Sequence, residues 1–362
     1  KIGHKILVKE QQKMKKDLSY LTDHYDSKIE KVKKINAPLN FIFYTDPHNG
    51  LSEWDCRKHE DYAADDFESA LNTAASMQYI IDRLSNLKCV VCGGDLGNDY
   101  HDDPDKAHES IVQIMDELYR LSVPVHCCIG NHDDCVISSY LEPLKSFPRF
   151  EQEKKPPVSE YILYPCELHE ICMKYNPTDK NYYFTDFEDL GYRFVFLNTS
   201  DFYYGFDDNG ELIHPFAVGV SREQVFWFRE AVNTDKKIIV FAHSPISMKG
   251  HFPDCTKQFE HMINGDWLWH EMQRADNVLA LIAGHLHYDN IVYDGKLVAI
   301  DTQSGTGVYK GKWDPASPKR EFGTITETAF DVISIKDDVI YCTRFGVGED
   351  RVARIIRGFE QF

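Results

Sequence analysis

Five short apolar runs, each ending in polar residues, constrain the fold of this chain more than any other feature. Each run has the length and composition of a buried strand, and each is followed directly by Asp, Asn or His. The runs with their polar ends cover residues 41–48, 89–95, 123–133, 238–243 and 278–287. Open α/β sheets place their chemistry at the carboxyl ends of strands. Five such strand ends with these residue types indicate a metal centre.

Helical periodicity between these runs predicts an α/β (α+β) fold. Residues 62–87 and 105–121 carry helical patterns, and strands alternating with helices are typical of parallel βαβ units. A further strand is expected at 192–198, and Ser221 is expected to cap a helix that contains Gln224. Short strands are expected in the last third, over 291–293, 297–300, 329–335 and 339–345. Prolines interrupt residues 141–190, which are interpreted as a cap or an insertion in a domain spanning 38–362.

Residues 1–37 differ in charge from the rest of the chain, with ten Lys against five acidic residues. Apolar residues recur there at a spacing near 3.5, with Lys28 at one position of the stripe. The stripe consists of Met14, Leu18, Leu21, Tyr25, Val32 and Ile35. This amphipathic, coiled-coil-like helix has two interpretations. It either forms a homo-oligomer or tether, or packs on its own catalytic domain.

Composition restricts the partners and the compartment. The net charge of −18 repels phosphate backbones and therefore disfavours long nucleic acids as partners. The longest apolar runs fall well short of the roughly 20 residues that cross a bilayer, so no membrane partner is expected. Several of the ten Cys lie inside predicted strands and are interpreted as reduced core residues. We therefore expect a cytoplasmic protein.

The polar strand ends have the composition of a transition-metal site. Asp46 and His48 are two residues apart, as are His285 and His287, so that each pair can reach one ion. Asp95 can bridge two cations, and Asn131 offers a neutral oxygen. Mixed imidazole and oxygen ligands suit Mn, Fe or Zn. Two such divalent ions, about 3.5–4 Å apart, stabilise both oxygens of an in-line displacement.

The motifs Asp-x-His, Gly-Asp, Gly-Asn-His-Asp, Ala-His-Ser-Pro and Gly-His-x-His occur in this order between residue 39 and about residue 290. The series resembles the calcineurin-like metallophosphoesterase superfamily. The resemblance implies a four-layer α/β/β/α sandwich with a dinuclear site at the sheet edges. It implies one metal held by Asp46, His48, Asp95 and His287, and a second held by Asp95, Asn131, His243 and His285. A metal-bridging hydroxide would attack phosphorus.

Further residue assignments accompany this chemistry. His132 would assist the leaving group, and Asp133 would orient its imidazole ring. Asn98 and Asp99 either contact substrate or make the turn, and His251 is expected at the border of the pocket. Aromatic residues of the loop from 199 to 217, including Tyr203 and Tyr204, would stack on a base or sugar or else cover the sheet edge. The stretch 304–307 would cradle a phosphate or form an ordinary turn.

Departures from known branches narrow the expected function. The chain has Asp133 where protein Ser/Thr phosphatases have Glu, and Asn98 where purple acid phosphatases have a Tyr ligand. What remains resembles the bacterial and phage branch. We expect a phosphoesterase that acts on a small phosphorylated substrate. Diesters are favoured because the sequence shows little sign of arginines that would bind a dianionic phosphate group. The alternatives are a nucleotidase or phosphomonoesterase, and a non-catalytic scaffold or phage-type assembly protein on the same fold.

Overall fold

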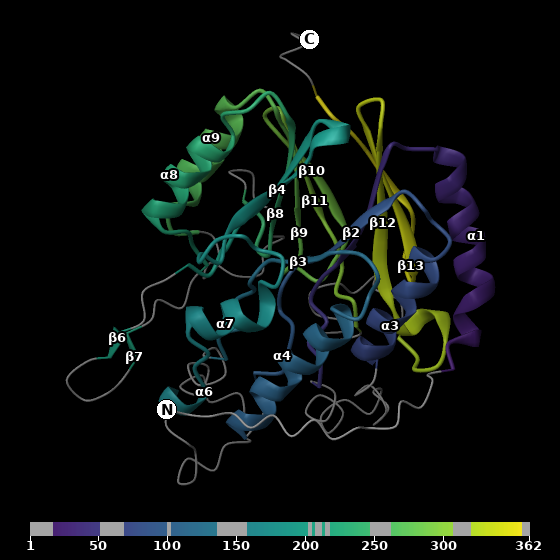
Figure 1. The fold of residues 1–362 in the computed structure, drawn as a ribbon, viewed down its shortest axis with the longest axis horizontal. Coiled ribbons are helices and arrows are strands. Elements are labelled where there is room, and N and C mark those ends of the chain that lie inside the picture. Colours follow the sequence, from purple (N-terminus) through teal and green to yellow (C-terminus); the bar gives the residue numbers. More distant parts are fainter. Residues whose placement is uncertain are drawn as a thin grey trace.

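Two six-stranded sheets pack face to face, with helices on both outer sides (Figure 1). This computed structural model describes residues 17–50, 69–99, 103–135, 158–201, 205–206, 212–213, 218–246, 262–306 and 320–356. The predicted four-layer α/β/β/α sandwich is confirmed.

The first sheet has the strand order β14-β13-β12-β1-β2-β3. Its strands are β1 (Leu39–Tyr44), β2 (Leu87–Cys92), β3 (Val125–Cys127), β12 (Ala329–Lys336), β13 (Val339–Gly346) and β14 (Arg351–Arg354). β1, β2 and β3 are parallel, whereas β12 runs antiparallel to β1. The loops that leave β1, β2 and β3 therefore meet at one edge of this sheet.

The second sheet has the order β10-β11-β9-β8-β5-β4. Its strands are β4 (Tyr183–Phe187), β5 (Tyr192–Phe196), β8 (Lys237–Ala242), β9 (Val278–Ala283), β10 (Asn290–Asp294) and β11 (Leu297–Asp301). The four inner strands are parallel, so the loops after β8 and β9 leave the sheet at the same edge. A separate ribbon pairs β6 (Gly205–Phe206) with β7 (Leu212–Ile213).

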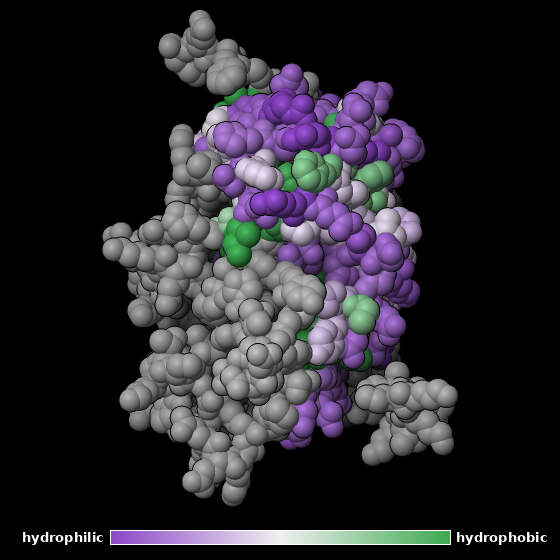
Figure 2. Space-filling view, turned by 90° about the vertical axis from the view of Figure 1, so that its left-hand side faces the viewer, coloured by the Kyte–Doolittle hydropathy of each residue, from purple (hydrophilic) through white to green (hydrophobic). Residues whose placement is uncertain are grey.

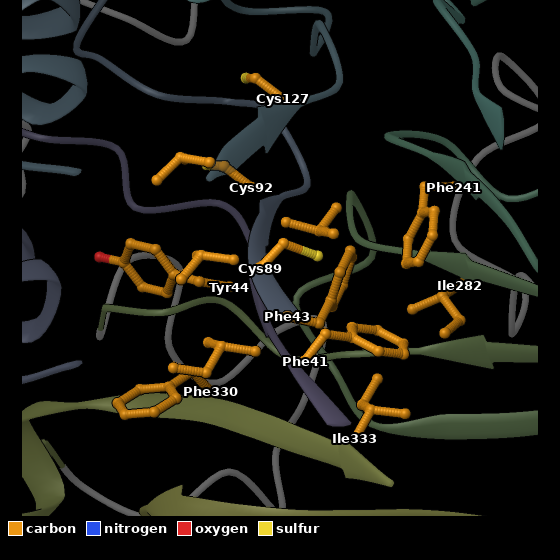
Figure 3. Packing of buried hydrophobic residues seen from close by; sticks show 14 of the residues in the cluster. Phe41, Phe43, Tyr44, Cys89, Cys92, Cys127, Phe241, Ile282, Phe330 and Ile333 are labelled. Atoms are coloured by element: carbon orange, nitrogen blue, oxygen red, sulfur yellow. The ribbon is translucent and has the colours of Figure 1, made fainter. Parts of the chain in front are cut away.

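Aromatic side chains fill the space between the sheets. Phe41 of β1 packs edge-on against Phe194 of β5, with ring centroids 4.9 Å apart, and against Phe241 of β8 at 5.5 Å. On the other face of β1, Tyr44 lies 6.5 Å from Phe330 of β12 (Figure 3). Because both faces of β1 are buried, its sequence is apolar apart from Asn40 rather than alternating.

Helices α8 (Arg222–Ala231) and α9 (Gly265–Arg274) cover the outer face of the second sheet. The predicted cap of α8 is confirmed, because Ser221 Oγ accepts a hydrogen bond from the Gln224 amide at 3.1 Å. Both helices bury apolar residues such as Phe228 and Leu268 against the sheet. The described outer surface on this side is mainly hydrophilic, with scattered hydrophobic residues (Figure 2).

Helices α3 (Ser69–Ile81), α4 (Pro104–Leu118) and α1 (Ser19–Ile35) lie outside the first sheet (Figure 1). Helix α1 buries Leu21, Tyr25, Ile29 and Val32 against β12 and β13. Tyr25 packs edge-on against Phe345 at 5.2 Å, and Lys28 forms an ion pair with Asp350 at 2.9 Å. In the described residues, then, α1 packs on its own domain. Association through residues 1–37 stays a prediction, and residues 1–16 lie outside the described part.

Several elements were not predicted from the sequence. The described half of the proline-rich segment contains α6 (Val158–Tyr161), α7 (Pro165–Cys172) and β4, followed by the single turn η3 (Glu188–Leu190). Pro165 occupies the first helical position of α7, where its missing N–H costs nothing. Leu168 and Cys172 are buried in the main core, so α7 packs against the sandwich, and the interpretation of residues 141–190 as a cap or insertion stays a prediction. Helix α9, strand β14 and the turn η4 (Ile325–Glu327) were also missed.

No helix among the described residues has the length and apolar character that a membrane span requires.

Candidate metal centre

The loops after β1, β2, β3, β8 and β9 bring seven side chains together at the shared edge of the two sheets. They are the seven predicted ligands, Asp46, His48, Asp95, Asn131, His243, His285 and His287. Six of them form two groups, each with ligand atoms within 4.8 Å of one another. The first group is Asp46, His48, Asp95 and His287, and the second is Asp95, His243 and His285. Asp95 belongs to both groups, as a bridging ligand would.

The first group is held at ligand spacing. The Nε2 atoms of His48 and His287 lie 3.2 Å apart, and His287 Nε2 lies 3.1 Å from Asp46 Oδ1. Asp95 Oδ2 lies 3.6 Å from His48 Nε2. Four donor atoms from three different loops therefore surround one small volume.

The second group is centred on His243. Its Nε2 lies 3.2 Å from Asp95 Oδ2, 3.0 Å from Asn131 Oδ1 and 3.2 Å from His285 Nδ1. On the other side of the ring, Nδ1 donates to the Gly93 carbonyl oxygen at 2.8 Å, which fixes the tautomer and directs the Nε2 lone pair at the group. Asn131 adds a neutral oxygen to this second group.

The backbone at five ligands is in the sparsely populated left-handed region. The φ angles are 52° at Asp46, 41° at His48, 54° at Asp95, 68° at His285 and 58° at His287. Such conformations cost on the order of 1–3 kcal/mol each and persist where the surroundings enforce them. Hydrogen bonds do so here: the His285 amide donates to both oxygens of Asp46, and the His48 amide donates to the Asp95 carbonyl.

Glycine precedes Asp95 and Asn131 because the loops after β2 and β3 approach each other closely. A Cβ atom on Gly130 would overlap the carboxylate of Asp95, and one on Gly94 would overlap the backbone of Gly130. Gly94 also has a φ of +92°, which other residues rarely adopt. The Gly-Asp and Gly-Asn-His-Asp motifs are therefore packing requirements as well as sources of ligands.

The donor set fits divalent metal ions. Asp46 and Asp95 are buried, and a buried carboxylate needs a compensating positive charge. Burial lowers the pKa of His48 and of His285 to about 3, so both rings are neutral and offer lone pairs. Neutral imidazole nitrogens with carboxylate and amide oxygens are typical ligands of Mn, Fe and Zn. The residues present could thus hold two divalent cations, one in each group.

His132 lies beside the two groups, with its ring centroid 5.3 Å from that of His48. Its Nδ1 lies 3.0 Å from Asp99 Oδ1, and its backbone amide donates to Asp95 Oδ1 at 3.0 Å. Burial by itself would lower the pKa of His132, but the charges of Asp99 and Asp95 outweigh this effect and raise the pKa to about 10. A cationic imidazole in this position can act as a proton donor.

The prediction that Asp133 orients the His132 ring is wrong. The Asp133 carboxylate accepts hydrogen bonds from the backbone amides of Gly130 at 2.7 Å, Leu96 at 2.6 Å and Asp95 at 3.1 Å. It therefore ties the loops after β2 and β3 together, while Asp99 holds the ring. Asp99 was considered only as a substrate or turn residue, although its place in the Asp95 loop puts it near the same site.

Asn98 makes the turn after Asp95. Its side chain is 4% exposed and donates from Nδ2 to the Gly50 carbonyl at 2.7 Å, while its amide donates to Ser110 Oγ at 2.8 Å. A role of Asn98 in substrate binding stays a prediction. The other three predicted substrate-binding residues, Tyr203, Tyr204 and His251, lie outside the described residues.

A solved structure with a TM-score above 0.5 supports this architecture, and two further structures are similar at lower scores. A dimetal phosphatase from Danio rerio superposes with a TM-score of 0.55 at 16% identity, covering 89% of this chain and 100% of that chain. GAP50, described as the anchor in the inner membrane complex of Plasmodium, has a TM-score of 0.49, 16% identity and coverages of 89% and 90%. A putative 5'-nucleotidase from Staphylococcus aureus has a TM-score of 0.42, 13% identity and coverages of 88% and 55%. At these identities the likeness concerns the fold alone.

The sequence comparisons place the chain in a family. None of the curated proteins matches it. The model of the calcineurin-like phosphoesterase family matches residues 39–289, from the first residue of β1 to just beyond His287. That span holds all seven candidate ligands and His132. The chain therefore belongs to the calcineurin-like phosphoesterase family.

Proposed function

We propose that this protein is a dinuclear metal-dependent phosphoesterase that hydrolyses a small phosphodiester. The observation that carries the proposal is the shared carboxylate of Asp95. It contributes to both ligand groups and accepts a hydrogen bond from the backbone amide of His132. The ligand groups and the proton donor are thus built around one side chain. When bound, two divalent cations supply an activated water and polarise the phosphoryl oxygen.

The chain's own residues supply the proton and its direction. Asp99 accepts a hydrogen bond from Nδ1 of His132, and Nε2 would be the nitrogen that protonates the departing oxygen. Asp99 also keeps the ring cationic, because its negative charge favours the imidazolium. The hydrogen bond from the His132 amide to Asp95 Oδ1 fixes the distance between the donor and the shared ligand.

The charges around the ligands favour a monoanionic diester over a dianionic monoester. In the described part of the chain, Asp46 and Asp95 contact histidines, a hydroxyl group and backbone amides, but no arginine. A dianion would gain more from an Arg clamp than a diester would. Long nucleic acids remain disfavoured by the net charge of −18.

A non-catalytic scaffold on the same fold is the alternative from another class. A scaffold would not need a buried Asp99–His132 pair, nor five ligands in left-handed conformation. Both features cost stability and are found where function requires them. The intact pair therefore favours an enzyme.

Hydrolysis of two model esters separates these possibilities. Protein loaded with Mn, Fe or Zn is expected to cleave bis-p-nitrophenyl phosphate faster than p-nitrophenyl phosphate, measured as release of p-nitrophenolate. Faster cleavage of the monoester would instead support a phosphatase or nucleotidase. If the protein bound two metal ions but hydrolysed neither ester, this result would contradict the proposed phosphoesterase activity and favour the scaffold.

Asp99→Asn tests the proton donor. Asparagine keeps the shape of the side chain but removes the negative charge that orients the His132 ring and favours its protonated form. We therefore expect kcat to fall by about 10- to 100-fold. Metal content should stay at the wild-type value, as measured by elemental analysis. Asp105→Asn, on the exposed start of α4, is the control and should leave kcat unchanged. A wild-type kcat in Asp99→Asn would exclude the assigned role of Asp99.

A further inference from the structure

The segment that follows β11, residues 303–306, contacts the two loops that carry most of the first ligand group. We propose that this segment is a positioning strap for the metal centre. It would hold the loop of Asp46 and His48 in fixed relation to the loop of His285 and His287. The inference rests on the proposed dinuclear centre and extends it to residues beyond the part of the chain that matches the family model.

One half of the strap holds the loop after β1. Ser304 Oγ shares its hydrogen between the carbonyl oxygens of Asp46 at 2.8 Å and Thr306 at 2.9 Å. Thr306 Oγ1 donates to the carbonyl oxygen of Pro47 at 3.1 Å. The Gly305 amide donates to the carbonyl oxygen of Thr45 at 2.8 Å. Three successive residues of the strap thus hold three successive carbonyl groups around Asp46.

The strap can approach this closely because Gly305 lacks a side chain. A Cβ atom at Gly305 would overlap the ring of Tyr44, the last residue of β1. Ser304 is 2% exposed and Thr306 is 7% exposed, so water competes little for their hydroxyl groups. The hydroxyls are committed to backbone carbonyls, which favours an ordinary turn over a phosphate cradle for residues 304–306.

The other half of the strap holds the loop after β9. Gln303 donates to both carboxylate oxygens of Asp289, from its amide at 3.1 Å and from Nε2 at 3.0 Å. Asp289 stands two residues after His287. Its Oδ1 also accepts from Arg344 Nη2 at 2.6 Å, and Arg344 is fully buried in β13. The carboxylate is therefore clamped between the strap and the first sheet.

These contacts matter because the loops they hold are strained. Asp46, His48 and His287 have left-handed backbones, and their ligand atoms must stay within a few tenths of an ångström of metal-binding distance. Partners outside the ligand shell typically change metal affinity by 10- to 100-fold when they are removed. Ser304 and Asp289 touch no ligand side chain in the described contacts, so they act through the backbone as positioning residues.

Ser304→Ala, compared with Ser334→Ala, tests the strap. Ser334 is also a buried serine, and its Oγ donates to Asn40 Oδ1 at 2.6 Å between β12 and β1, within the strands rather than at their carboxyl-end loops. Both variants lose one buried hydroxyl and should lose similar thermal stability. Mn²⁺ affinity, measured by calorimetry or chelator competition, should fall about tenfold or more at one of two sites in Ser304→Ala and stay unchanged in Ser334→Ala.

A second variant and a spectroscopic measurement keep the test independent of folding and of activity. Asp289→Asn retains the shape of the side chain and should weaken the same Mn²⁺ site if Ser304→Ala does not fold. Absorption of the Co²⁺-loaded protein should change in both strap variants, because it reports ligand geometry. Equal Mn²⁺ affinities and Co²⁺ spectra in wild type, Ser304→Ala and Asp289→Asn would overturn the strap.

The outcome is separable from that of the proposed function. If wild-type protein binds two Mn²⁺ ions and hydrolyses neither ester, the phosphoesterase proposal fails while the strap can still be measured by affinity. If wild type is active and the strap variants bind Mn²⁺ normally, only the strap fails.

Discussion

Asp95→Asn is expected to reduce diester hydrolysis by about 1,000-fold or more. Asp95 is the side chain common to both ligand groups, with Oδ2 at 3.2 Å from His243 Nε2 and 3.6 Å from His48 Nε2. Loss of its charge weakens both metal positions at once. Several kcal/mol of transition-state stabilisation are typical of a metal ion in such a site, and about 4 kcal/mol corresponds to roughly three orders of magnitude. The measurement is kcat for bis-p-nitrophenyl phosphate together with metal content.

Asp294→Asn is the matched control for this prediction. Asp294 is buried as well, but its carboxylate accepts from Trp269 Nε1 at 2.8 Å on the β10 side of the second sheet and belongs to neither ligand group. The control should retain the wild-type kcat and both metal ions. If Asp95→Asn kept more than a tenth of the activity with two ions bound, the shared carboxylate would not organise the centre.

Arg344→Met is expected to lower the free energy of unfolding by about 3–5 kcal/mol, because it breaks a buried ion network. Arg344 donates from Nε to Asp331 Oδ1 at 2.9 Å and from Nη2 to Asp289 Oδ1 at 2.6 Å, and both Arg344 and Asp331 are inaccessible to solvent. Methionine fills the volume of the side chain but leaves Asp331 with Arg351 as its remaining cationic partner among the described contacts. Chemical denaturation measures the loss.

The double variant Arg344→Met with Asp331→Leu replaces the buried pair by apolar side chains. It should recover part of the lost free energy of unfolding, since apolar replacement of a whole buried pair is often neutral.

Low pH should reduce the destabilisation that the single variant Arg344→Met causes. Burial raises the pKa of Asp331, but Arg344 and Arg351 outweigh burial and hold it below its ordinary value of 3.8. The stabilisation is present above about pH 4 and is lost as pH falls through the lowered pKa. A loss under about 1 kcal/mol at neutral pH would show that the network contributes little.

The metal centre could be predicted largely from the sequence because its residues follow buried strands directly. Asp46, Asp95 and His243 each stand within three residues of the end of a buried strand, and the carboxyl ends of parallel strands must share an edge. The spacing of His285 and His287 after β9 added the remaining pair. Each of these assignments needs only a strand direction and a residue type.

The partner of His132 could not be predicted in this way. Asp133 is adjacent to His132 in sequence, but the turn directs its carboxylate toward the amides of Leu96 and Gly130. Asp99 is 33 residues away from His132 and reaches the ring because the loops after β2 and β3 fold against each other. Proximity in sequence was therefore a poor guide to hydrogen bonding between two loops.

The position of α1 likewise depended on tertiary contacts. Its apolar stripe predicts burial but not the surface that covers it, and the same stripe would suit a coiled coil. Packing of Tyr25 against Phe330 and Phe345 of the first sheet shows that the described helix packs on its own domain.

The strand β4 was not predicted because the prolines before it indicated irregular structure, although this short strand pairs with β5.

The sequence alone indicated which side chains form the candidate metal centre and at which sheet edge they gather, since strand periodicity and residue type are local properties. Tertiary structure decided how those side chains are held. Asp99 on His132, Ser304 on the Asp46 loop and Asp289 between Gln303 and Arg344 join segments that are distant along the chain. Such contacts depend on the relative placement of loops, which in turn depends on the packing of the two sheets. No short window of sequence contains that information.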